Sequence, residues 1–252
     1  MKLLCKKTAR GRVLICSTIL TLLFLFPSCN NAFEESARLK KSLKQQTQEQ
    51  SKEQKEQIEI LESDDGFKYS VAGRSVAIYG LSDQTDRVHL VIPAKIDGKP
   101  VTEIAEKAFY EEKAIFSVEF PESLEKIGPY AFYGCDNLIK IELPANVKSI
   151  ENAFRGCDSL ETVILNDGIE DISGAFEYAP IETITIPSSV TSMDSAFCDC
   201  RNLKNVTLAE GITEVSEYAF WSCQNLKTVN LPKSLIEIKK SAFKDKIGRA
   251  HV

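Results

Sequence analysis

The hydrophobic positions of this chain recur with a period of about 22 residues from residue 88 onward. The clearest marker is the dipeptide Ala-Phe, which occurs at 108–109, 131–132, 153–154, 175–176, 196–197, 219–220 and 242–243. The successive Phe residues are 23, 22, 22, 21, 23 and 23 positions apart. Self-similarity at a fixed period of this size indicates a repeat architecture.

Within each unit, apolar and polar residues alternate over a few positions before the chain turns. Residues 138–144 (LIKIELP) and 226–232 (LKTVNLP) are two examples. This alternation predicts a half-buried strand, and the proline ends the strand because it cannot donate a hydrogen bond to a ladder. A second short apolar segment follows, with Val147 and Ile150 in the first example. The Ala-Phe pair then leads into a turn that is rich in Gly, Cys, Asp and Asn.

A coil of about 22 residues is too short to close a core of its own, so its apolar side must be covered by neighbouring coils. Stacking brings the strand parts together as a parallel sheet and buries a continuous apolar column. We therefore expect a solenoid of about seven coils of 21–23 residues with the parallel β-sheet on one face. Each repeat Phe should stack on the Phe of the next coil.

The repeat frame L-x-x-I-x-L-P, followed by an isoleucine segment, Ala-Phe and a Cys-Asx-x-Leu turn, resembles leucine-rich repeats of the BspA-like type, which are named for bacterial surface proteins. The resemblance implies an α/β-type repeat solenoid over residues 88–246. The preceding residues 65–87 resemble that family's strand-rich first unit, which we expect to cap the first coil. Asp97-Gly98 is in addition a hairpin-turn signal.

For function, the resemblance implies adhesion or protein–protein interaction with a host or with neighbouring cells. A glycan-binding or cell-envelope scaffold role is the alternative, because repeats of this type are scaffolds and a fold alone does not specify a function. We expect no enzyme activity, no metal site and no cofactor. Only two histidines occur, His89 and His251, and no glycine-rich phosphate loop is present.

The first 28 residues have the character of an export signal. They hold five basic and no acidic residues, and an apolar run over 13–26 is shorter than the roughly 20 residues that span a bilayer. Phe26-Pro27-Ser28-Cys29 resembles the cleavage site of bacterial lipoproteins, although Phe26 and Pro27 depart from the usual pattern. The resemblance implies a lipid on Cys29 and an exported protein anchored to the bacterial cell envelope, at the outer membrane or cell surface. Plain secretion and an uncleaved anchor are the alternatives.

Residues 29–64 are predicted to form a charged, partly helical or disordered tether. They are rich in Glu, Lys and Gln and contain too few aliphatic residues to fold alone. The formal net charge of the chain is −5, and it becomes about −10 without residues 1–28, because 26 Lys and Arg then face 36 Asp and Glu. This acidity disfavours a nucleic acid as a partner.

The cysteines of the repeats divide into two kinds. Four share one column, three residues after the repeat Phe, and Ala179 fills that column in another unit. A position that accepts Cys or Ala is small and buried, so we expect a ladder of buried thiols, with disulfides between neighbouring coils as the alternative. The four are Cys135, Cys157, Cys200 and Cys223. Cys198 lies outside that column, and we expect it to be partly exposed.

A partner would meet the outward positions of the strands, which the frame identifies. In the middle and C-terminal units these positions are mostly Thr and Asn. Such a row either pairs across strands for stability or presents a neutral hydrogen-bonding face to a protein or a glycan. The candidate positions are Lys140, Glu142, Thr162, Thr183, Thr185, Asn205, Thr207, Thr228 and Asn230. Trp221, the single Trp, follows Phe220 and is either an anchor for a partner or a shield for the last turns.

The last six residues, 247–252, differ from the repeat frame, and no polar capping unit follows Phe243. Their sequence matches the translation of a common sequencing adapter. We expect this tail to be non-native and the natural protein to carry further repeats.

Overall fold

The computed structural model describes residues 58–82 and 89–245, and in this part the regular elements are all β-strands. The predicted signal segment, Cys29, most of the predicted tether and the suspected tail lie outside the described residues. So do residues 83–88, between the cap segment and the repeats.

The chain enters the fold through a small antiparallel sheet. Strand β1 (Leu61–Glu62) pairs with β2 (Phe67–Ala72), which pairs with β3 (Ser75–Leu81). Strands β5 (Lys95–Ile96) and β6 (Lys99–Ile104) form a hairpin, and Asp97 and Gly98 at its turn have φ values of 52° and 73°. This is the hairpin that Asp97-Gly98 predicted, since both turn residues are left-handed, as a type I′ turn requires.

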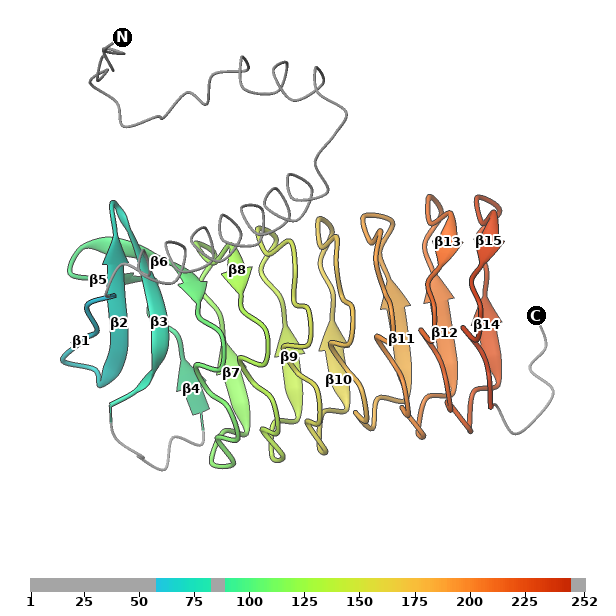
Figure 1. Cartoon of the computed structure of the whole chain (residues 1–252), viewed down its shortest axis with the longest axis horizontal. Coiled ribbons are helices and arrows are strands. Elements are labelled where there is room, and N and C mark those ends of the chain that lie inside the picture. The colour runs from blue at the N-terminus through green and yellow to red at the C-terminus, as the bar shows by residue number, and fades with distance from the viewer. Residues whose placement is uncertain (1–57, 83–88, 246–252) are drawn as a thin grey trace, which may run out of the picture. The chain divides into compact units, whose positions relative to one another are not determined.

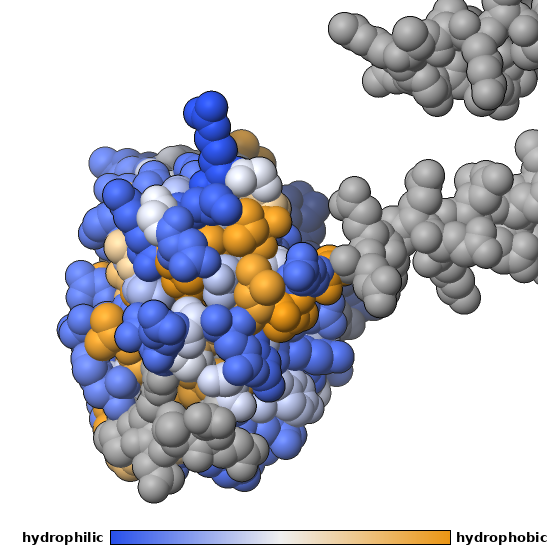
Figure 2. All heavy atoms as spheres, turned by 90° about the vertical axis from the view of Figure 1, so that its left-hand side faces the viewer, coloured by the Kyte–Doolittle hydropathy of each residue, from blue (hydrophilic) through white to orange (hydrophobic). Residues whose placement is uncertain are grey.

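The antiparallel sheet closes the N-terminal end of the core. Strand β3 runs parallel to β6, and through β6 it joins β8 (Lys126–Ile127) of the next coil. Phe67, Ile78 and Val101 are buried in this region, within the same core cluster as the first repeat Phe, Phe109. Figure 2 shows this end of the molecule, where a largely hydrophilic surface carries scattered apolar patches.

The repeats form a row of parallel strands, one in each coil (Figure 1). Strands β4, β7, β9 and β10 make one sheet, and β11, β12 and β14 make a second sheet. Along each strand the second side chain points into the core, and its two neighbours point outward. The bounds are β4 His89–Val91, β7 Ser117–Glu119, β9 Lys140–Glu142, β10 Thr162–Ile164, β11 Thr183–Ile186, β12 Asn205–Leu208 and β14 Thr228–Asn230.

The repeat phenylalanines form the predicted column. Ring centroids of neighbouring coils are 5.0–6.1 Å apart, and the rings are nearly parallel. Each Phe N–H also donates to the Ala carbonyl of the next coil at 2.8–3.1 Å, from Phe109 to Phe220. The column therefore combines stacked rings with a main-chain ladder, and this confirms the solenoid of about seven coils.

The α/β label needs a correction, because no helix occurs among the described residues. The Ala-Phe turn is flanked in every coil by two residues with φ between 54° and 71°, one two places before Phe and one two places after it. In the central coil these are Gly174 and Tyr178. A left-handed residue every four positions cannot continue a right-handed helix, so the coils close through consecutive turns instead.

A second, shorter ladder runs along the side of the coils that carries the isoleucine segment. It falls into three groups: β3, β6 and β8; single bridges Ser149–Asp171–Ser192; and β13 (Glu214–Val215) with β15 (Glu237–Ile238). The three groups differ in the number of residues between the isoleucine segment and the repeat Ala. The core residue of this segment lies four positions before the repeat Ala in the outer groups, as with Ile127 and Ala131. It lies three positions before in the middle group, as with Ile150 and Ala153. A one-residue change shifts the register and ends the ladder.

Candidate interaction surface

The outward side chains of the strand row form a continuous candidate surface. Eight of the nine predicted positions are exposed, and Thr207 is half-buried. The strands hold them in register, so that Thr183 lies beside Asn205, and Asn205 lies beside Thr228. A single row of coils therefore brings residues that are 22 or 23 positions apart in sequence to one face.

The C-terminal part of this surface is neutral. Thr185, Thr207 and Asn230 are adjacent on three strands, and the Asn230 side-chain amide donates to the Thr207 hydroxyl at 3.2 Å. Cross-strand pairing, one of the two interpretations of this row from the sequence, thus occurs between Asn230 and Thr207. Exposed donors and acceptors remain along the rest of the row, which is suited to hydrogen bonding with a partner.

The N-terminal part of the surface is charged. His89 Nε2 lies 3.2 Å from Glu119 Oε1, and His89 Nδ1 contacts the Ser117 hydroxyl. Lys140 Nζ lies 3.7 Å from Glu142 Oε2. These groups line a shallow groove of about 460 Å³ over β4, β7 and β9. The surface therefore changes along its length from paired charges to neutral Thr and Asn.

The turns after the repeat Phe form a second column of functional groups. Arg155 Nη2 lies 2.8 Å from Glu177 Oε2, and Glu177 is buried. Burial raises the pKa of Glu177 and the Asp199 carboxylate adds to this, while Arg155 opposes it. The Arg155 guanidinium also lies over the Tyr178 ring, with Cζ 6.0 Å from the ring centre.

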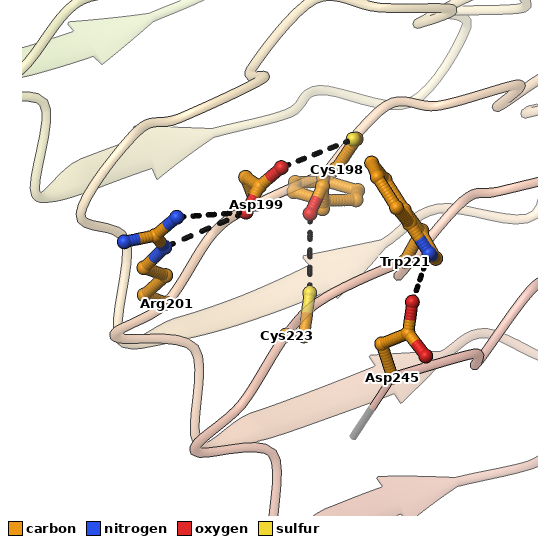
Figure 3. A network of polar contacts seen from close by, with 7 residues as sticks. Cys198, Asp199, Arg201, Trp221, Cys223 and Asp245 are labelled. Carbon is orange, nitrogen blue, oxygen red and sulfur yellow. Dashed lines mark hydrogen bonds and ion pairs between the residues drawn. The ribbon is translucent and has the colours of Figure 1, made fainter. Parts of the chain in front are cut away.

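Cys198 follows in that column and corrects one expectation. The sequence predicted partial exposure, but the residue is only 7% exposed, under the turns of the adjacent coils. Burial, with the nearby Glu177 and Asp199 carboxylates, raises its pKa to about 12. The neighbouring coil supplies Trp221, whose indole N–H donates to Asp245 at 2.8 Å (Figure 3). Trp221 is half-buried and packs edge-on to Tyr218, so its anchor role stays a prediction.

The four-cysteine column is buried, and Cys135, Cys157 and Cys200 form no disulfide in the structure. Each thiol donates to the carbonyl of the repeat Phe in the preceding coil, with S···O distances of 3.0–3.2 Å. Figure 3 shows this contact for Cys223. Burial is also the main cause of the raised pKa of Cys135, Cys157 and Cys200. These thiols stay protonated and serve as small donors inside the core.

The sequence reasoning missed the clefts that open where the ladders are interrupted. The strand sheet is interrupted between β10 and β11, and a cleft of about 400 Å³ lies there, beside Thr162, Thr183 and Pro180. A wider cleft of about 760 Å³ lies where the isoleucine-segment ladder stops, between β8 and Ser149. The sequence signal that could have predicted both clefts was the unequal length of the repeats.

The described part of the chain lacks two further features. Residues 58–82 and 89–245 contain no group of three His, Cys, Asp or Glu side chains arranged to hold a metal ion. Within these same ranges, no helix has the length and apolar character needed to cross a membrane.

Comparison with known proteins decides the family. A family model described as BspA type Leucine rich repeat region matches six copies, over residues 90–195 and 173–248. The chain belongs to this family. The BspA-type repeats coincide with the coils that carry the stacked Phe column. No curated protein matches the chain.

Two solved structures share the fold of these BspA-type repeats. The T. pallidum leucine-rich repeat protein TpLRR is 30% identical, with a TM-score of 0.64, and the match covers 71% of this chain and 86% of that one. A leucine-rich repeat protein from Bacteroides ovatus ATCC 8483 is 24% identical, with a TM-score of 0.56. That match covers 68% of this chain and 53% of the other, so this chain spans about half of that relative.

Proposed function

We propose that this BspA-type repeat protein binds a protein partner at the cell surface through the outward face of its strand row, and that it thereby mediates adhesion to a host or to neighbouring cells. The observation that carries the proposal is the exposure of polar side chains on neighbouring parallel strands, such as Thr183, Asn205 and Thr228. Solenoids use such extended faces to bind partners.

The character of this face supports a protein ligand. Its C-terminal part offers uncharged donors and acceptors, and its N-terminal part offers charges that are already paired, as in Lys140 with Glu142. A face with little net charge binds through shape and hydrogen bonds and does not depend on long-range attraction. The clefts between coils add hollows into which a partner's side chains can fit.

The proposal includes export and a lipid anchor on Cys29. Its support is the basic, then apolar, first 28 residues, which end directly before that cysteine. Two or more acyl chains hold a protein stably on a membrane, whereas one is marginal. Palmitate labelling of cells that express the chain tests this part: label that is absent from Cys29→Ala supports the anchor, and label that persists overturns it.

A binding screen tests the function. The whole chain, solubilised in mild detergent, is presented to immobilised matrix proteins in native and enzymatically deglycosylated form. Saturable binding that survives deglycosylation supports a protein ligand. Binding that disappears with the sugars favours the glycan-binding alternative. Capture of only a fixed envelope partner from the producing cell favours the scaffold alternative, and either result overturns the protein-adhesion proposal.

A further inference from the structure

The turn of the fourth coil, between Phe176 and Ile181, breaks the repeat pattern. Five positions separate these two residues, whereas six separate Phe from Leu in the turns on either side, as from Phe154 to Leu160. Ala179-Pro180 stands where the neighbouring turns have Cys and two polar residues. This turn leads directly into β11, where the strand sheet is interrupted.

The same turn presents an exposed aromatic side chain. Tyr178 has a φ of 71°, and the two preceding coils have glycine at this position, Gly134 and Gly156. A left-handed φ occurs at this position in every coil, as at Glu111 and Asp199, so the backbone conformation belongs to the repeat. The feature that distinguishes this turn is the tyrosine itself, which is 49% exposed.

The Tyr178 ring borders a cleft of about 350 Å³ whose other walls are polar. The lining residues are Tyr178, Pro180, Asp199, Arg201 and Asn202. The Asp199 side chain is only 12% exposed, and it accepts hydrogen bonds from Arg201 Nε and Nη2 at 3.4 Å each. Pro180 and Asn202 also line the 400 Å³ cleft beside β10 and β11, so the two hollows adjoin. Both volumes lie in the range of small-ligand sites.

The charges around the cleft are matched one to one. Arg201 pairs with Asp199, and Arg155, next to the Tyr178 ring, pairs with Glu177. A site with no net charge does not select an ionic ligand. It offers one flat apolar surface on Tyr178, donors on Arg201 and Asn202, and an acceptor on Asp199.

We propose that this cleft is a binding site for a neutral saccharide. One face of a sugar ring would pack on Tyr178, because the C–H face of a pyranose is apolar and flat, and its hydroxyls would bond to Asp199, Arg201 and Asn202. Aromatic residues with a few convergent polar groups are the general composition of such sites. The Tyr178 cleft is lined by turn residues and by none of the outward strand positions, so the proposal goes beyond the proposed protein binding and does not depend on it.

Titration calorimetry on the whole chain tests the proposal, with maltotriose, chitotriose and lactose as probes and a heparin hexasaccharide as the charged comparison. Tyr178→Gly is the main variant, because glycine fits the left-handed backbone there. Tyr218→Gly is the matched control: it removes another exposed tyrosine with positive φ (56°) at a position that is Gly174 in the fourth coil.

The proposal expects at least one neutral probe to bind saturably, with affinity about tenfold weaker in Tyr178→Gly and unchanged in Tyr218→Gly. Asn202→Ala, at an exposed position, should weaken the same probe and serves if Tyr178→Gly does not fold. No binding to any neutral probe, preference for the heparin fragment, or binding that is insensitive to Tyr178→Gly and Asn202→Ala overturns it.

Discussion

The thiol of Cys157 donates to the main-chain carbonyl of Phe132 in the preceding coil, with 3.1 Å between sulfur and oxygen. The same relationship recurs in three other coils, which makes the cysteine column part of the hydrogen bonding of the solenoid. A cysteine suits this place because it is small and apolar, and yet carries one weak donor.

Removing this donor should cost stability. Cys157→Ala deletes a fully buried sulfur and the hydrogen bond to Phe132, so the free energy of unfolding should fall by about 1–2 kcal/mol. Urea denaturation followed by circular dichroism measures it. Ser159→Ala, at a half-buried position of the same turn, is the control and should change stability by less than about 0.5 kcal/mol. A Cys157→Ala protein as stable as the parent would contradict the role assigned to the thiol.

The pKa of Cys157 predicts how stability depends on pH. Burial raises it from 9.0 to about 12, so between these values the folded chain keeps a proton that the unfolded chain releases. The stabilisation is therefore complete below pH 9 and is lost as the pH rises toward 12, by about 1.4 kcal/mol per pH unit. Urea midpoints at pH 8 to 11 should decline less steeply in Cys157→Ala than in the parent. Equal slopes would show that this thiol ionises as easily in the fold as outside it.

Burial also predicts poor reactivity of the thiols. Iodoacetamide at pH 8 should leave Cys135, Cys157, Cys198, Cys200 and Cys223 unmodified in the native chain and modify all five in urea, because the thiolate is the reactive form. Peptide mass spectrometry identifies each site. Rapid labelling of Cys198 alone in the native chain would contradict its burial and support the partial exposure predicted from the sequence.

The Phe column should carry much of the stability. Phe176→Ala empties a fully buried position between two stacked rings, and should cost about 3–5 kcal/mol. Phe243→Ala is the comparison at the last described coil, where the ring is half-buried, and it should cost distinctly less. Thermal or urea unfolding of the two variants decides the matter, and similar losses would mean that the stacked column is not the source of stability.

The repeat period made the fold predictable from the sequence. Seven Ala-Phe pairs fixed the coils, the parallel strands and the stacked rings, because each regular unit must adopt the conformation of its neighbours. The absence of helices in the described coils was not foreseen. It depends on left-handed residues such as Asn152 and Tyr178, and the amino-acid types at these positions do not indicate a positive φ.

The candidate surfaces were predictable only in part. The alternation in the strands identified the outward Thr and Asn positions, since side-chain direction in a strand has a period of two. The partial exposure predicted for Cys198 was wrong, because the burial of this side chain depends on the turns of adjacent coils. The Tyr178 cleft was missed because it arises from a deletion of one residue, which shifts register between coils and leaves the composition unchanged.

The most direct test of the central claim is the affinity of the whole chain for the matrix protein that binds in the screen, with and without substitutions on the strand face. Thr183→Arg combined with Thr207→Arg places two long charged side chains on that face. The matched control, Thr191→Arg combined with Thr213→Arg, adds the same charge at exposed positions next to the isoleucine segment. We expect Kd to rise about tenfold or more in the face variant and to stay within about twofold in the control. Equal affinities in the two variants would contradict binding through the strand face.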